Sequence, residues 1–262
     1  MLTESERRKA AEELAAAESA RSPIRPLTET YDGITTVDAY EIQLIGIRDR
    51  LAAGGTVRGH KVGLSSPVMQ RMMGVDEPDY GHLLDTMELT EDTPVPVGRY
   101  CAPRVEVEIG FVLGAALPGA ECTVADVLAA TERVVPALEL IDSRIADWRI
   151  AIADTIADNA SSAGYVTGAG RPTGELDLRD VTAHLTDDTG AHLASGRGDA
   201  VLGDPAESVA WLARTVARFG VRLEAGHLIL PGSCTRAVDV APGRTYTADF
   251  TGLGPVSLTF TK

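Results

Sequence analysis

The stretch Arg104–Leu113, which reads RVEVEIGFVL, decides the fold class of this 262-residue chain. Successive side chains of a strand point to opposite faces, so the valines and the isoleucine are predicted to face a core. Glu106 and Glu108 then point together from the other face. Two parallel carboxylates repel each other, which leaves two interpretations: a solvent-facing strand surface or a bound cation.

A third acid, Glu139, lies in the apolar run ALELI at residues 137–141, which is typical of a buried strand. A single buried carboxylate is costly to desolvate. A hard divalent cation such as Mg2+ or Mn2+ would relieve this cost and the repulsion together, because both ions take oxygen ligands. The alternative is an ion pair between Glu139 and an arginine such as Arg144, and the spacing leaves both open.

Composition narrows the class of protein. The chain is 44% hydrophobic and carries a net charge of -14 from 24 basic and 38 acidic residues. It shows no basic stripe, so neither nucleic acid nor an anionic membrane is an expected partner. Its three cysteines, Cys101, Cys122 and Cys234, form no CxxC pair, and the N-terminus lacks a signal-peptide apolar region. We therefore expect a cytoplasmic protein.

The chain is predicted to divide into a small, mostly helical region at 1–75 and a strand-rich catalytic core at 76–262. The first region holds expected helices at 4–20 and from Thr36 to about residue 53, a strand at 57–64, and a short helix opened by Ser66 and Pro67. Strands are predicted at 80–84, 104–113, 137–142, 163–168, 180–187, 191–197, 227–230, 245–250 and 255–261. Helices are predicted at 123–134, 147–157 and 205–219. This irregular alternation favours an α+β or β-roll architecture.

Four further residues are candidates for chemistry. Lys61 lies in an apolar strand, where it could act as a base or proton shuttle, or be a surface lysine whose stem packs on the strand. Asp79 could orient a catalytic group or satisfy a turn. Ser161 and Thr235 lie in loops rich in small polar residues that could bind an anion. No HExxH or GxSxG motif is present, which disfavours a zinc protease or serine hydrolase.

Together, six segments resemble the hydratase/decarboxylase branch of the fumarylacetoacetate hydrolase superfamily. They cover most of the chain in family order, and the resemblance is strongest to 2-hydroxydienoate hydratases of aromatic and steroid meta-cleavage pathways. Residues 141–149 and 235–237 look most like the steroid-degrading type. The segments are GHKVGLSS at 59–66, MGVDEPDYGHL at 73–83, PRVEVE at 103–108, PALELID at 136–142, ADNASSAG at 157–164 and LPGSCT at 230–235.

The resemblance implies a mixed, barrel-like β-roll core with a small helical N-terminal region and one Mg2+ or Mn2+ per subunit. Glu106, Glu108 and Glu139 match the metal ligands of the family, and Lys61 matches its active-site lysine, with Asp79 nearby. Members usually form ring-like homo-oligomers, often pentamers or decamers. Association with a pathway decarboxylase or aldolase is a further expectation.

The implied reaction adds water to 2-hydroxypenta- or 2-hydroxyhexa-2,4-dienoate, giving a 4-hydroxy-2-oxo acid, with Ser161 and Thr235 expected to position substrate carboxylate or water. The nearest alternative is a decarboxylase of the 4-oxalocrotonate type. It would need another cation, which Arg104, Arg144 or Arg236 could supply. A carbon–carbon hydrolase of acylpyruvates and a non-catalytic partner subunit are further alternatives.

Overall fold

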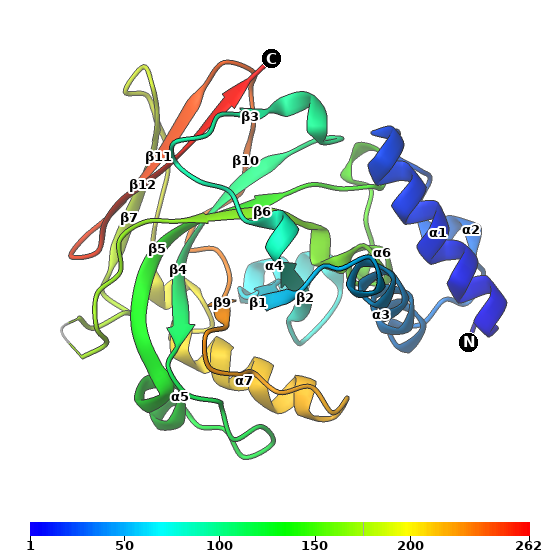
Figure 1. Cartoon of the computed structure of the whole chain (residues 1–262), viewed down its shortest axis with the longest axis horizontal. Helices are drawn as coiled ribbons and strands as arrows, with labels where there is room; N and C mark the ends of the chain where they lie inside the picture. Colours follow the sequence, from blue (N-terminus) through cyan, green and yellow to red (C-terminus); the bar gives the residue numbers. More distant parts are fainter. Residues whose placement is uncertain (175) are drawn as a thin grey trace.

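The computed structural model describes residues 1–174 and 176–262. Helices α1, α2 and α3 form the predicted N-terminal helical region, at the right of Figure 1. The α helices are α1 (Glu4–Ala20), α2 (Leu27–Thr30), α3 (Thr36–Ala52), α4 (Pro67–Met73), α5 (Val124–Ala130), α6 (Ile152–Ala157) and α7 (Pro205–Ala217). Short 3-10 turns lie at Asp85–Met87, Val97–Arg99, Ala146–Trp148, Asn159–Ser161 and Gly198–Ala200. Among the described residues, none of these helices combines the length and apolar character that spanning a membrane requires.

The helix starts follow local capping rules. Thr3 and Glu6 form a reciprocal capping box at the start of α1, and Ser66 caps α4 ahead of a proline. Helix α3 also begins with a capping box, but the cap is Thr35, one residue before the predicted Thr36.

A large mixed sheet carries most of the candidate site residues. Its strand order is β2-β1-β9-β4-β5-β6, with β10 also paired to β4. Strand β1 pairs parallel with β9 and antiparallel with β2, so the first 75 residues contribute a strand to this sheet, and the boundary at residue 75 stays a prediction. The strands are β1 (Val57–Gly63), β2 (Asp79–Leu84), β4 (Arg104–Leu113), β5 (Thr131–Ile141), β6 (Ser162–Thr167), β9 (Leu228–Leu230) and β10 (Val238–Asp239).

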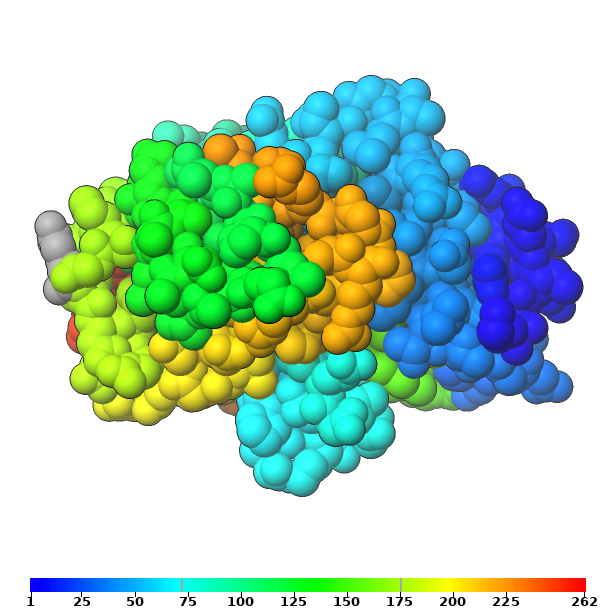
Figure 2. Space-filling view, turned by 90° about the horizontal axis from the view of Figure 1, so that it is seen from below, coloured from blue at the N-terminus to red at the C-terminus, as the bar shows by residue number. Residues whose placement is uncertain are grey.

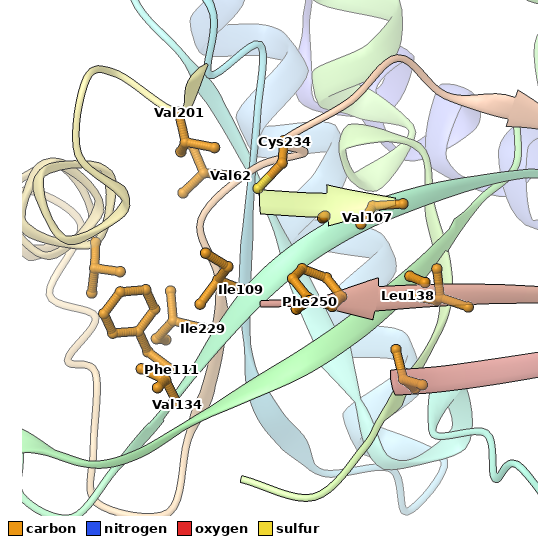
Figure 3. Packing of buried hydrophobic residues seen from close by; sticks show 14 of the residues in the cluster. Val62, Val107, Ile109, Phe111, Val134, Leu138, Val201, Ile229, Cys234 and Phe250 are labelled. Carbon is orange, nitrogen blue, oxygen red and sulfur yellow. The ribbon is translucent and has the colours of Figure 1, made fainter. Parts of the chain in front are cut away.

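A second sheet has the order β3-β12-β11-β7-β8, and the large sheet curls beside it as a half-barrel (Figure 1). The main core lies between the sheets and against α7, and Figure 3 shows Phe111, Leu138 and Phe250 within it. Burying side chains of this size contributes about 1.5–3 kcal/mol each. The predicted α+β, barrel-like fold is confirmed. The strands of this sheet are β3 (Val95–Pro96), β7 (Thr182–Asp187), β8 (His192–Arg197), β11 (Thr245–Phe250) and β12 (Gly254–Thr261).

Three predicted boundaries are wrong by several residues. The helix expected at 123–134 ends at Ala130, and β5 begins at Thr131 rather than 137. The segment TERVVP explains this, because β-branched residues prefer strands and Pro136 cannot continue a helix. The helix expected at 147–157 begins at Ile152, because Asp147 and Trp148 adopt positive φ angles of 59° and 54°.

Candidate active site

Three carboxylates meet on one face of the large sheet. Glu106 on β4 lies directly opposite Glu139 on β5, and Glu108 is two residues further along the same face. One oxygen of each carboxylate lies within 4.8 Å of the others. Glu106 is 8% exposed, and Glu108 and Glu139 are fully buried. The solvent-facing interpretation of the glutamate pair is therefore wrong.

Each of the two deepest carboxylates has one oxygen that accepts a hydrogen bond and one that accepts none from the described residues. The Ser162 hydroxyl donates to Glu139 Oε1 at 2.8 Å, and the Gly232 N–H donates to Glu108 Oε2 at 2.7 Å. The other oxygens, Glu108 Oε1 and Glu139 Oε2, are buried and accept no hydrogen bond from the described residues. Buried oxygen donors with free lone pairs are the ligand type that Mg2+ and Mn2+ prefer, so these residues fit a divalent cation.

The electrostatics of the cluster agree with that fit. Burial, opposed by Lys61 and reinforced by Glu139, raises the pKa of Glu106 to about 7. Burial, with Glu139 and Glu106 adding to it, raises the pKa of Glu108 well above its ordinary value. Ionising Glu106 and Glu108 together is thus unfavourable unless a compensating positive charge is present.

Lys61 supplies part of that charge. It is 3% exposed, its Nζ lies 3.4 Å from Glu139 Oε2, and it donates to the Ala160 carbonyl at 3.0 Å. Burial lowers the pKa of the Lys61 ammonium, but Glu139 and Glu106 outweigh burial and raise it. Lys61 is therefore protonated at neutral pH. The alternative pairing of Glu139 with Arg144 is wrong, since Arg144 binds Asp158 in a separate buried ion pair.

Asp79 faces the same space from β2. Its strand partner is Gly63, where a Cβ would lie 2.2 Å from Asp79 Oδ1 and 3.5 Å from Lys61 Nζ. Asp79 Oδ2 accepts a 3.4 Å hydrogen bond from Thr155, and Oδ1 is buried without a partner among the described residues. Burial raises the pKa of Asp79 despite nearby Lys61. The glycine is needed to bring this carboxyl close to the lysine.

The loop after α6 completes the polar lining. Asn159, Ala160 and Ser161 have consecutive positive φ angles of 55°, 50° and 58°. The Asn159 side chain holds the turn by pairing with both backbone groups of His82, at 2.8 and 2.9 Å. The Ser161 hydroxyl is buried and has no partner among the described residues. Strained backbone of this kind is concentrated at functional sites.

A cavity of about 80 Å³ opens beside the cluster, and Glu106 is the one of the three carboxylates that lines it. Helix α4, in the cyan segment that projects at the bottom of Figure 2, contributes Met69 to the lining. Thr235 does not line the cavity, and its hydroxyl donates to the Arg236 carbonyl. The polar lining residues are Lys61, Ser65, Asp79, Glu106, Thr155, Ser161 and Ser233. The apolar ones include Leu64, Met69, Ile141, Trp148 and Ile150.

Sequence reasoning missed Ser65, Thr155 and Ser233 in this lining. Gly232 could have indicated them, because a glycine in this polar loop marks a tight turn. Its φ is +118°, and a Cβ added there would lie 1.9 Å from the Ser65 hydroxyl oxygen. None of the histidines in the described parts of the chain lines the cavity. His60 is next to Lys61 on β1, so its side chain points to the opposite face of the sheet. The histidine base expected of an acylpyruvate hydrolase is therefore missing from this lining.

Comparison with known proteins gives strong matches along the whole chain, although no protein-family model matches. The chain is 44% identical over 261 residues to a 2-keto-4-pentenoate hydratase of Paraburkholderia xenovorans (strain LB400), covering 99% of this chain and 96% of the relative. It is 43% identical over 258 residues to a 2-oxo-hept-4-ene-1,7-dioate hydratase of Escherichia coli, covering 95% and 96%.

Solved structures agree with the fold. A 4-oxalocrotonate decarboxylase from Pseudomonas putida G7, complexed with magnesium and adipate, has a TM-score of 0.96, 36% identity and 99% coverage of both chains. A fumarylpyruvate hydrolase from Pseudomonas aeruginosa, at 16% identity, shares the fold with a TM-score of 0.62 over 78% of this chain and 89% of that one. The chain therefore belongs to the hydratase/decarboxylase branch of the fumarylacetoacetate hydrolase superfamily.

Proposed function

We propose that the protein is a divalent-metal-dependent hydratase that adds water to a short 2-hydroxy-2,4-dienoate, giving a 4-hydroxy-2-oxo acid. The observation that carries this proposal is the buried cluster of three carboxylates beside the Lys61 ammonium, in which Glu108 Oε1 and Glu139 Oε2 accept no hydrogen bond from the described residues. Relatives at 40–45% identity named as 2-keto-4-pentenoate, 2-hydroxyhexa-2,4-dienoate and 2-hydroxypent-2,4-dienoate hydratases support the reaction class.

Glu106, Glu108 and Glu139 would hold the cation, which we propose to be Mg2+ or Mn2+. Similar solved structures are complexed with magnesium, calcium and manganese. When bound, the ion would supply Lewis-acid stabilisation of the negative charge that develops on the 2-oxygen of the substrate.

The side chains beside the cluster perform the proton transfers in this proposal. Asp79, whose Oδ1 is free, accepts the enol proton of the substrate, and the Lys61 ammonium delivers a proton to C5. The result is a 2-oxo-3-enoate, whose C4 is electrophilic by conjugation with the carbonyl. Water then adds its hydroxyl to C4 while its proton passes to the neutral Lys61 amine, and Asp79 gives the proton that it took from the enol to C3, which restores both side chains. Ser161, whose hydroxyl is free, positions the substrate carboxylate or this water.

The wider setting is also a proposal. Relatives that act on meta-cleavage products support a place in the catabolism of aromatic ring-cleavage products, and the steroid branch stays a prediction. A homo-oligomer, pentameric or decameric, and association with a pathway decarboxylase or aldolase remain expectations from the resemblance. The small polar residues around Thr235 in the sequence are the basis for proposing that it binds substrate, although its side chain lies outside the cavity lining.

The test follows the ultraviolet absorbance of 2-hydroxypenta- and 2-hydroxyhexa-2,4-dienoate with the purified protein in Mg2+ and in EDTA. We expect rapid loss of dienoate absorbance in Mg2+, loss of activity in EDTA, and recovery when Mg2+ is restored. Glu139→Gln should abolish turnover, whereas Glu132→Gln, an exposed acid on the same strand, should not. Full activity in EDTA would overturn the metal role, and no turnover by metal-loaded protein would favour a non-catalytic subunit.

A further inference from the structure

The lining of the active-site cavity divides by chemistry. Lys61 and Glu106 belong to the polar part, where the metal, the carboxylate and the 2-oxygen of the substrate would meet. The rest of the described lining carries no ionised group apart from Asp79: it combines the hydroxyls of Ser65, Thr155, Ser161 and Ser233 with apolar side chains that include Leu64, Met69 and Trp148. Apart from Lys61, none of the lining residues that the structure describes carries a positive charge.

The arginines that could bind a second carboxylate are engaged elsewhere. Arg144 is buried against Asp158, to which its Nε and backbone N–H both donate. Arg236 is exposed and donates to the Leu193 carbonyl. Neither side chain lines the cavity.

Arg104 comes nearer, because it stacks on Trp148, which lines the cavity. The Arg104 guanidinium sits 4.4 Å from the centre of the Trp148 ring and also binds Asp239. The indole Nε1 of Trp148 donates to the Ala102 carbonyl at 3.0 Å, which fixes the ring. Trp148 lines the cavity and Arg104 does not. The indole ring therefore contacts the Arg104 guanidinium and also offers apolar surface to a substrate.

We infer that Met69 and Trp148 are specificity-determining residues that select a dienoate with one carboxylate and a short uncharged tail. This inference rests on the proposed function and extends it to the substrate tail. A dienedioate would bring its second carboxylate against apolar side chains without a cation, where an unpaired charge is costly to bury. The net charge of -14 adds an unfavourable background for a second negative charge.

A matched substrate pair tests the selection. 2-Hydroxyhexa-2,4-dienoate and 2-hydroxyhepta-2,4-diene-1,7-dioate differ in the tail, where a methyl group is replaced by a carboxymethyl group. We expect the Mg2+-loaded protein to have a kcat/KM about 100-fold or more higher for the monocarboxylate, the range reached when a site leaves a polar group unpaired. Equal values for the two substrates would overturn the inference. Failure to hydrate either substrate would instead overturn the proposed function.

Two variants test the residues. Met69→Lys places an ammonium group beside the tail, and we expect the ratio of kcat/KM to move toward the dienedioate by about 10-fold or more. Val68→Lys is the matched control, because Val68 is the preceding residue on α4, is 58% exposed and lies outside the lining. Val68→Lys should leave the ratio unchanged, and an equal shift in both lysine variants would mean general charge attraction rather than a tail contact.

Trp148→Ala is the second variant and removes the cavity-lining ring on which Arg104 stacks. We expect it also to move the ratio toward the dienedioate, and Arg104→Gln in the same protein to reverse that shift. The assignment is overturned if Met69→Lys and Trp148→Ala both keep measurable turnover and both have the wild-type ratio of kcat/KM.

Discussion

Glu106→Gln is predicted to stabilise the metal-free protein while abolishing metal-dependent turnover. Glu106 is 8% exposed, and burial together with Glu139 raises its pKa to about 7 although Lys61 acts in the opposite direction. An unfolded glutamate ionises near pH 4.5. The folded protein therefore retains a proton at Glu106 between about pH 4.5 and 7 that the unfolded chain has released.

The size of the effect follows from this difference. Because the folded pKa is raised, stability is lost as pH rises through the window, by about 1.4 kcal/mol per pH unit. The shift from 4.5 to about 7 corresponds to about 3 kcal/mol at pH 8. Glutamine has a similar shape and no charge, so the variant escapes this cost. For a chain of this size, 3 kcal/mol corresponds to a Tm higher by roughly 6–12 °C.

The assay is thermal unfolding in EDTA at pH 8 and at pH 5, with Glu132→Gln as the exposed control. At pH 5 the wild-type Glu106 is already protonated when folded, so the advantage of the variant should shrink to about 1 kcal/mol or less. Mg2+ should raise the Tm of the wild type far more than that of Glu106→Gln. The variant lacks one of the proposed ligands, and a cation stabilises the folded state only when it binds. A variant no more stable than wild type at pH 8, or an advantage equal at both pH values, would refute the reasoning.

Three further predictions address other groups. Lys61→Met should lower kcat by about 100-fold or more while changing the calorimetric Mg2+ affinity much less, and an unchanged kcat would remove Lys61 from the mechanism. Gly63→Ala should lower both kcat and Tm, since its Cβ would lie 2.2 Å from Asp79 Oδ1, whereas Gly98→Ala, with open space around it, should change neither. Burial lowers the pKa of His82 to about 4, so between pH 7 and 5 the unfolded chain takes up a proton at His82 that the folded protein does not. The free energy of unfolding should therefore fall by about 2 kcal/mol over this range. In urea unfolding with EDTA present, His82→Gln should lack this decrease between pH 7 and 5. The same pH dependence in the variant and the wild type would contradict the prediction.

Local patterns in the sequence predicted part of this site well. The alternation in Arg104–Leu113 places Glu106 and Glu108 on one face, because strand geometry depends on neighbouring residues only. Pairing Glu106 with Glu139 depends on the register between two strands separated by a helix and a loop, which local patterns do not determine. The family resemblance supplied that connection.

Long-range packing decides the features that local patterns leave open. The sequence alone allows an ion pair between Glu139 and Arg144, but in the structure Arg144 pairs with Asp158. Thr235 and Ser233 lie two residues apart in one loop, and the turn at Gly232 directs Ser233 into the cavity. Near Thr131 the helical pattern continued past the real boundary, because pairing with β4 extends the strand backward.

The position of β9 has a consequence for how the molecule is synthesised. Strand β1 is joined to β4 through Leu228–Leu230, which pair with both. During translation, Lys61 and the three glutamates leave the ribosome long before these residues do. Until then β1 and β4 lack the strand that pairs with both of them. The active site is therefore assembled late, and a nascent chain that stops before residue 228 would expose the edges of β1 and β4 to other chains.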